Sequence, residues 1–167
     1  MLVQFLRRTV FKYVFNHILR HKYIHNLQSG FLPGYSTSHQ LVEIYHCIMT
    51  AFENQTPLSL TFCDVSKAFD RVWIGDLIYK LKKYGIRGDI LEWLKTYLTD
   101  RKQKVVLNNT ESKIGCLYAG VPRGSDLGPI LFLIYNNDIA DHTDGLQTCR
   151  TWLILTSQTL KSGVKTG

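Results

Sequence analysis

The stretch Leu58–Val72 reads LSLTFCDVSKAFDRV, and the rest of the chain is best understood as support for it. Residues 58–63 follow a proline, mainly favour β-structure and end at Asp64, which predicts a buried strand with a carboxylate at its C-terminal edge. Such a carboxylate suits Mg²⁺, which takes oxygen ligands, usually one or two carboxylates plus substrate phosphates. Asp64 could instead cap a following helix, since Asp is a preferred N-cap residue. This stretch alone leaves both interpretations open.

A second informative stretch is Ala119–Asp138, which reads AGVPRGSDLGPILFLIYNND. Its glycines and prolines predict a tight loop, and the apolar run ILFLIY predicts a buried helix that follows the loop. A glycine-rich turn that enters a helix presents backbone N–H groups, which can bind phosphate or let a nucleotide approach closely.

Taken together, the two stretches carry a family resemblance. FCDVSKAFDRV, followed about fifty residues later by AGVPRGSDLGPILFLIYNNDI, resembles the reverse transcriptase domain of non-LTR (LINE-type) retrotransposons. That family reads F-x-D-x-S-K-A-F-D and then G-V-P-Q-G-S-x-L-G-P-x-L-F. QSGFLPGYSTSHQ at residues 28–40 resembles its upstream motif, and RKQKVVLNN at residues 101–109 resembles its intervening hairpin. The resemblance covers roughly residues 1–141, with the motifs in the family's order.

The resemblance implies a fold and an activity. The expected fold is α+β, a fingers and palm fragment of a right-hand polymerase with helices around a small antiparallel sheet. The implied activity is that of an RNA-directed DNA polymerase, which performs RNA-templated DNA synthesis in retrotransposition. The implied partners are an RNA template, a DNA primer and a dNTP, and the implied cofactor is Mg²⁺.

Site residues follow from the same resemblance. Asp64 matches the first catalytic, metal-binding carboxylate of the polymerase palm. Phe69 matches the bulky residue that excludes a ribose 2′-OH and so selects deoxynucleotides, although a buried core aromatic is the alternative for a Phe. Asp70 is expected to be structural, paired with Arg71 or a helix end. The residues implied to bind the nucleotide are Val65, Phe69, Pro122, Arg123 and Gly124.

Several positions depart from the family pattern. Arg123 stands where the family has Gln; its fork of donors could touch phosphate, but it is not an isostere of Gln. Asp126 replaces an apolar residue, and a carboxylate beside a phosphate site is unfavourable unless a metal or Arg123 offsets it. Leu32 and Tyr35 stand where the family often has arginines that help to hold the triphosphate.

The second catalytic carboxylate motif of the family, F/Y-A-D-D, does not occur in the 167 residues. Phosphoryl transfer by two metals needs carboxylates from two places in the chain. We therefore expect residues 1–140 to form a partial reverse transcriptase domain and residues 141–167 a divergent, disordered tail. The chain as it stands is expected to be inactive as a polymerase.

Basic residues support a second function. The net charge of +7 and the pI of about 9.3 favour polyanionic partners, nucleic acid first. Residues 101–107 and 112–118 predict a hairpin that turns at Asn108-Asn109. Arg101, Lys102 and Lys104 give this hairpin a basic edge, either simply solvated or, by the resemblance, in contact with nucleic acid. The alternative function is a non-catalytic nucleic-acid-binding remnant of a retrotransposon.

The remaining helices are expected at residues 2–25, after a capping box at Thr37 and Gln40, at residues 76–84, and after a cap at Asp89. His17, His21 and His25 fall four apart, a spacing that zinc can use, but no fourth ligand is indicated and surface histidines are favoured.

Cysteine usage and hydropathy bear on location. The four cysteines form no C-x-x-C pair, which argues against a zinc site and a disulfide framework and for a reducing compartment. No apolar run reaches the ~18–20 residues of a membrane span. An intracellular protein of the nucleus or cytoplasm is expected, neither secreted nor bound to a membrane.

Overall fold

The computed structural model describes residues 2–26, 28–60, 62, 65–108 and 110–139. The chain divides into two compact units. Unit 1 comprises Met1–Tyr23 and Ala68–Tyr135, and unit 2 comprises Ile24–Lys67 and Asn136–Gly167.

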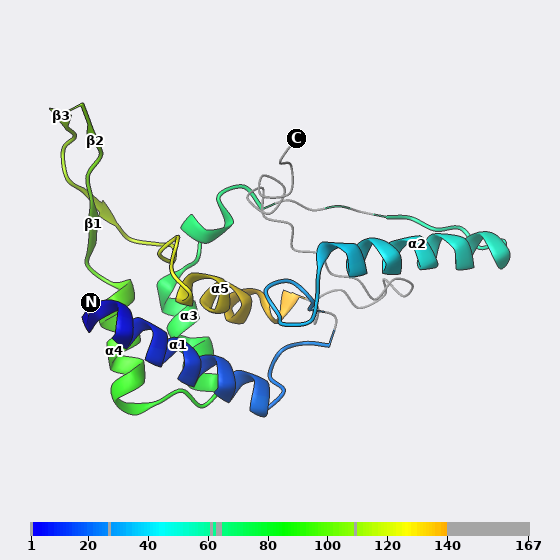
Figure 1. The fold of residues 1–167 in the computed structure, drawn as a ribbon, viewed down its shortest axis with the longest axis horizontal. Helices are drawn as coiled ribbons and strands as arrows, with labels where there is room; N and C mark the ends of the chain where they lie inside the picture. Colours follow the sequence, from blue (N-terminus) through cyan, green and yellow to red (C-terminus); the bar gives the residue numbers. More distant parts are fainter. Residues whose placement is uncertain (1, 27, 61, 63–64, 109, 140–167) are drawn as a thin grey trace. The chain divides into compact units, whose positions relative to one another are not determined.

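Unit 1 holds the apolar core. Its elements are α1 (Leu2–Arg20), a 3₁₀ turn at Ala68–Asp70, α3 (Ile74–Lys83), α4 (Gly88–Leu98) and all but the last residue of α5 (Leu127–Asn136) (Figure 1). The core includes Val72, which lies just before α3. The helices contribute Val10, Val14 and Ile18 of α1, Leu77 and Leu81 of α3, Leu91, Leu94 and Leu98 of α4, and Leu127 and Ile130–Ile134 of α5. Because α5 is apolar on nearly every side, it is buried, and the helix predicted from ILFLIY is confirmed.

The helix ends in unit 1 refine the sequence predictions. The first helix ends at Arg20 rather than near residue 25, so His25 lies outside it. The helix α3 ends at Lys83 with Tyr84 as its C-cap, and Gly85 follows with φ +81°, the left-handed conformation that commonly terminates helices. The cap predicted at Asp89 is wrong: α4 begins at Gly88, after an Arg87 N-cap without a side-chain bond. Asp89 instead lies in the first turn, where the helix dipole favours a negative charge.

The predicted hairpin is confirmed as two short antiparallel ladders. Strand β1 (Arg101–Gln103) pairs with β4 (Gly115–Leu117), and β2 (Val106–Leu107) pairs with β3 (Thr110–Glu111). Between the ladders, Ser112 N–H donates to the Val105 carbonyl at 2.8 Å, and Val105 N–H donates to the Ser112 hydroxyl at 2.9 Å. The hairpin extends away from the helices of unit 1 (Figure 1). The fold is therefore α+β, with antiparallel ladders that the helices do not surround.

Unit 2 contains α2 (Thr37–Glu53). The predicted capping box at Thr37 is wrong by one residue, because Ser36 is the N-cap and its hydroxyl accepts from His39 N–H at 3.3 Å. Ser36 has the extended backbone that an N-cap requires, whereas Thr37 is already helical. The large apolar side chains Leu41 and Phe52 are exposed, and the buried residue of α2 is Gln40.

The strand predicted at residues 58–63 is wrong for the residues that can be described. Residues 58–60 and Phe62 form no strand, and Phe62 is 68% exposed. A strand needs a neighbour for its backbone hydrogen bonds, and all four strands in the described part of the chain pair within the hairpin. Asp64, the predicted catalytic carboxylate, lies outside the described residues.

Candidate functional site

The two motif stretches meet in unit 1 through backbone hydrogen bonds. Gly120 N–H donates to the Val72 carbonyl at 2.8 Å, and Val121 N–H donates to the Phe69 carbonyl at 2.8 Å. These bonds join the start of the glycine-rich loop to the segment that carries the predicted sugar-selecting ring. The structure thus brings Phe69 together with the loop of Pro122, Arg123 and Gly124, which sequence reasoning linked only by resemblance.

Gly120 makes this close approach possible. Its φ is +87°, and a Cβ at this position would lie 2.8 Å from Asp70 Cα and 2.9 Å from the Asp70 and Phe69 carbonyl oxygens. No side chain fits without moving the backbone of the facing segment. Glycine is needed here both for its left-handed conformation and for the contact.

The other end of the loop folds back onto the start of α5. A Cβ on Gly128 would lie 2.6 Å from the Pro122 carbonyl oxygen. The Ser125 hydroxyl donates to that same carbonyl at 3.1 Å and accepts from Gly128 N–H at 3.2 Å. The loop is therefore fixed at both ends, and Gly124, with φ +72°, has open space around its Cβ position.

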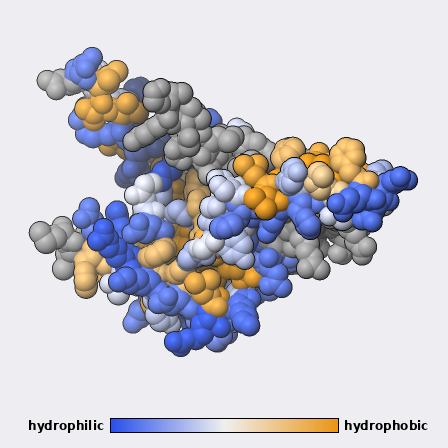
Figure 2. All heavy atoms as spheres, turned by 45° about the vertical axis from the view of Figure 1, so that its right-hand side comes forward, coloured by the Kyte–Doolittle hydropathy of each residue, from blue (hydrophilic) through white to orange (hydrophobic). Residues whose placement is uncertain are grey.

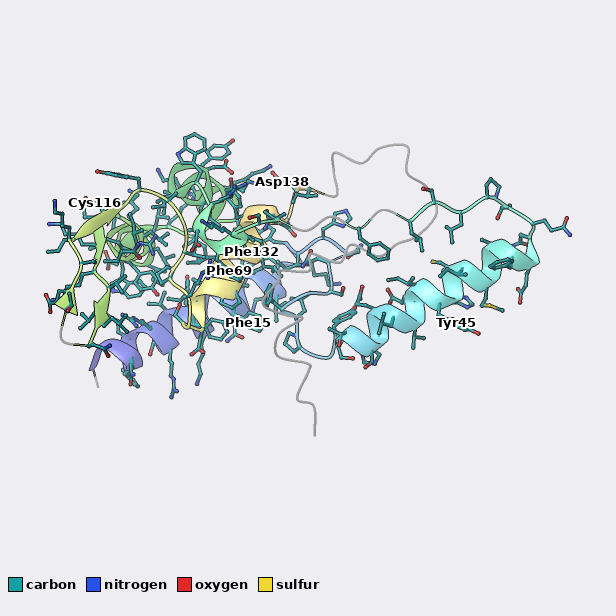
Figure 3. All side chains as sticks on the ribbon, turned by 90° about the horizontal axis from the view of Figure 1, so that it is seen from above. Phe15, Tyr45, Phe69, Cys116, Phe132 and Asp138 are labelled. Carbon is teal, nitrogen blue, oxygen red and sulfur yellow. The ribbon has the colours of Figure 1, made fainter. Side chains whose placement is uncertain are left out.

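Phe69 is held rigidly by an aromatic partner. Its half-buried ring packs on Phe132 of α5, with centroids 4.8 Å apart and planes inclined by 33° (Figure 3). The contact with Phe132 thus supports the alternative that Phe69 is a core aromatic residue. Because the ring is only half-buried, the same contact leaves part of it accessible.

The guanidinium of Arg123 pairs with Asp70. Nε donates to Oδ1 at 3.1 Å, and a second guanidinium N–H donates to Oδ2, which makes the pair bidentate. The partner of Asp70 is therefore Arg123, and the pairing expected with Arg71 is wrong. Both side chains are about half exposed, so the pair stabilises the fold by only ~0–1 kcal/mol. Its main effect is to fix the loop over the Phe69–Val72 segment.

Asp126 has a cationic neighbour other than the expected Arg123. Arg8 Nε of α1 lies 3.9 Å from Asp126 Oδ2, and both side chains are largely exposed. This is a long, solvent-screened ion pair, so it offsets the carboxylate only weakly.

The three basic hairpin residues have different environments. The Arg101 guanidinium donates to the carbonyls of Leu98 at 3.1 Å, Ala119 at 2.9 Å and Gly120 at 2.5 Å, so it links the end of α4 to the loop. Lys104 pairs across the hairpin with Glu111 at 2.6 Å, and Lys102 is exposed. Sequence reasoning missed the internal role of Arg101; its position just after a helix end was the available signal, because basic side chains there can bind the last carbonyls.

The other residues predicted from the sequence have different environments. Val65 is exposed and belongs to unit 2. The described residues contain no group of three His, Cys, Asp or Glu side chains that could hold a metal ion. His17 forms a hydrogen bond through Nε2 to the Tyr84 carbonyl at 2.8 Å, and its ring lies 4.6 Å from that of His21.

Two further findings concern the expectations on location. Cys47 is disulfide-bonded, so the expectation against disulfides is wrong for this residue. Within the described residues, none of the helices has the length and apolar character needed to cross a membrane.

Comparisons with known proteins agree with the motif pattern. Residues 1–151 match the family model for reverse transcriptase (RNA-dependent DNA polymerase). The chain is 38% identical over 118 residues to the probable RNA-directed DNA polymerase from transposon BS of Drosophila melanogaster, an alignment that covers 67% of this chain and 12% of that protein. It is 34% identical over 122 residues to the RNA-directed DNA polymerase from mobile element jockey of the same species, covering 73% of this chain and 13% of that protein.

A third relative, the probable RNA-directed DNA polymerase from transposon X-element, is 36% identical over 112 residues, covering 67% of this chain and 12% of that protein. The chain thus spans only about an eighth of the length of these curated relatives. No solved structure matches it significantly. The family match over nearly the whole chain is decisive, and the chain belongs to the reverse transcriptase family.

Proposed function

We propose that this chain is the part of a right-hand polymerase, fingers and palm, that contacts the incoming nucleotide during RNA-templated DNA synthesis. The observation that carries the proposal is the pair of hydrogen bonds from Gly120 and Val121 to the carbonyls of Val72 and Phe69. They place a glycine-rich loop, which a nucleotide can approach closely, beside the ring proposed to select the sugar. The partners in this proposal are an RNA template, a DNA primer and a dNTP.

Each residue of the loop region has a proposed task. The Phe69 ring, backed by Phe132, forms a rigid wall against C2′ of the sugar and leaves no room for a 2′-OH. Pro122 and Gly124 shape the loop so that its backbone lies against the nucleotide, and Val65 adds an apolar contact. Arg123 is proposed to reach phosphate when its pairing with Asp70 opens.

The metal remains tied to Asp64 on sequence grounds. When bound, Mg²⁺ would neutralise and clamp the triphosphate. The residues that the structure describes supply no ligand set for it, and the 167 residues contain no F/Y-A-D-D motif. We therefore propose no catalytic step through the metal, and we propose that these residues alone do not extend a primer.

Primer extension on an RNA template with Mg²⁺ and dNTPs tests both parts of the proposal. The 167 residues and their Asp64→Ala variant are both expected to be inactive. A fusion of the 167 residues to the segment of the jockey polymerase that would supply the F/Y-A-D-D motif should extend the primer. Asp64→Ala in this fusion should abolish the extension. In the active fusion, Phe69→Val should admit ribonucleotides. A fusion that folds but never extends would contradict the proposed function, and extension by the unfused chain that Asp64→Ala abolishes would contradict its inactivity.

A non-catalytic nucleic-acid-binding role is the second candidate, favoured by the exposed Lys102 and the net charge of +7. Because phosphate contacts release counterions, RNA affinity should fall steeply with salt concentration. Lys102→Ala should reduce the slope of log affinity against log salt by roughly one contact. Lys104→Ala should reduce it less, since Lys104 already pairs with Glu111. RNA binding without a salt dependence would count against this role.

A further inference from the structure

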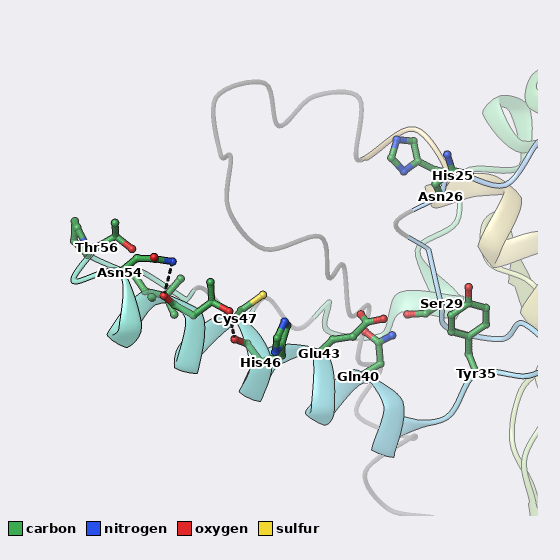
Figure 4. Close-up of a pocket in the computed structure, with 14 residues that line it drawn as sticks. His25, Asn26, Ser29, Tyr35, Gln40, Glu43, His46, Cys47, Asn54 and Thr56 are labelled. Atoms are coloured by element: carbon green, nitrogen blue, oxygen red, sulfur yellow. Dashed lines mark hydrogen bonds between the residues drawn. The ribbon is translucent and has the colours of Figure 1, made fainter.

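Unit 2 contains a cavity of about 1030 Å³ that lies between α2 and the segment preceding it (Figure 4). Its lining includes Gln40, Glu43 and His46 of α2 and His25, Ser29 and Tyr35 of the preceding segment, and residues 56–58 after α2 complete it. Its size is at the upper end of the roughly 300–1,000 Å³ typical of small-molecule sites. It involves neither the glycine-rich loop nor Phe69, both of which belong to unit 1.

Two buried polar atoms in the cavity wall have no hydrogen-bond partner. Ser29 Oγ and Gln40 Oε1 are unpaired, although the two residues are only 8% and 4% exposed. A buried polar group without a partner costs about 1–3 kcal/mol, so such groups are rare unless something completes them. Because the amide oxygen of Gln40 can only accept, a ligand that completes it must donate an N–H or O–H.

The charge of the cavity wall limits the class of ligand. No Lys or Arg lines the cavity among the described residues, and Lys67 is the only Lys or Arg in the described part of unit 2. The wall therefore lacks the cations that recognise phosphate, and the Glu43 carboxylate in the wall further disfavours an anionic ligand. The ligand is recognised by hydrogen bonds and shape rather than by a negative charge.

Flat rings indicate what kind of neutral donor fits. Tyr35, His25 and His46 are all lining residues, and aromatic and imidazole side chains stack on splayed-out bases. A side-chain amide is the group that commonly reads the exocyclic amine of adenine. We propose that this cavity binds a single unpaired adenine base, whose exocyclic amine donates to Gln40 and whose ring nitrogen or amine engages the Ser29 hydroxyl. The site does not depend on the polymerase activity, since a nucleoside without phosphates carries every group that the proposed contacts recognise.

Titration of the full chain with adenosine and with inosine, followed by calorimetry, tests the proposal. Inosine keeps the purine but replaces the amine with a carbonyl oxygen, which would face the acceptor of Gln40. Adenosine should bind, and inosine should bind at least about tenfold more weakly.

Variants then locate the site. Gln40→Met keeps a similar shape and removes the unpaired acceptor, so the fold should be retained and adenosine should lose its advantage over inosine. Ser29→Ala should weaken adenosine binding without abolishing the preference. Gln103→Met, an exposed glutamine of β1, is the matched control and should bind as the parent chain does.

The possible contrary results are distinct. If neither nucleoside binds, water completes the two polar atoms and the proposal is overturned. Equal binding of adenosine and inosine by the parent chain would also overturn it, and so would adenosine binding that Gln40→Met leaves unchanged. Preferential binding of N-methylacetamide, a small N–H donor without a base, would overturn it as well. None of these results affects primer extension by the fusion, so the two proposals fail independently.

Discussion

The two units differ in what they bury. Every buried apolar residue of the described chain belongs to unit 1, whereas the buried polar residues Ser29, Gln40 and Asn137 all belong to unit 2. Unit 2 also leaves large apolar side chains of α2 exposed, among them Leu41, Tyr45 and Phe52, and Figure 2 shows apolar atoms gathered along this helix. Since burial of apolar surface drives folding, unit 1 carries the stability of the chain. In unit 2, Asn137 accepts from His25 N–H at 2.8 Å, whereas Ser29 Oγ and Gln40 Oε1 have no hydrogen-bond partner.

The largest difference should come from truncating leucines in the two units. Leu94 of α4 is fully buried, so Leu94→Ala should lower the free energy of unfolding by about 2–5 kcal/mol. Leu41 of α2 is 66% exposed, so Leu41→Ala should change it by no more than about 0.5 kcal/mol. Urea unfolding followed by circular dichroism measures both. Similar losses in the two variants would show that α2 is packed and that the contrast between the units is wrong.

Glycine substitutions sharpen the comparison at the backbone. Gly120 and Gly34 both have left-handed φ, +87° and +83°, but only Gly120 faces backbone atoms within 3 Å of its Cβ position. Gly34→Ala should cost about 1 kcal/mol from conformation alone. Gly120→Ala should cost a further ~1–3 kcal/mol, because the loop must move away from Asp70.

Thermal unfolding of the two glycine variants provides the measurement. Equal losses would mean that the loop is not held against the Phe69–Val72 segment as described.

A helix cap tests how far unit 2 depends on local structure. Ser36→Ala removes the hydroxyl that accepts from His39 N–H and should cost about 1 kcal/mol, within the 0.5–2 kcal/mol range of such caps. Thr37→Ala is the control, since Thr37 is not the cap, and should have a smaller effect. The helical signal of the two variants in circular dichroism, with urea unfolding, checks the order. A larger loss from Thr37→Ala would restore the capping box that the sequence predicted.

The smallest effect is expected at the exposed ion pair of unit 1. Arg123→Gln installs the residue of the family pattern and removes the bidentate pair with Asp70, which should cost about 0–1 kcal/mol. In a double-mutant cycle with Asp70→Asn, the coupling energy should lie in the same range and decrease with added salt. Additive effects of the two changes would show that the pair contributes nothing to stability.

Local features were the ones that sequence could predict. The hairpin follows from two short segments on either side of the Asn108-Asn109 turn, and α5 follows from a continuous apolar run, because each needs only its own neighbours in sequence. For the candidate site, the family resemblance named Phe69 and the loop of Arg123 as nucleotide-binding residues, and the contact between their segments comes from the structure.

Features that depend on distant partners were missed. The strand expected at residues 58–63 needs a neighbouring strand, and nothing within the stretch shows whether one exists. The partner of Asp70 lies 53 residues away at Arg123, whereas sequence reasoning chose the adjacent Arg71. The unpaired Gln40 was read as part of a capping box, because spacing reveals a helix start but not which side of the helix is buried.

Native-state hydrogen exchange of the Gly120 and Val121 amides tests the central claim most directly, because these two bonds join the motif segments. We predict that both amides are protected as strongly as that of Leu131 in the buried helix α5, and that Gly120→Ala removes the protection while the amide of Leu131 keeps it. If Gly120 and Val121 exchange as fast as an unstructured peptide while α5 remains protected, the two motifs are not joined, and the proposed nucleotide site does not exist in this chain.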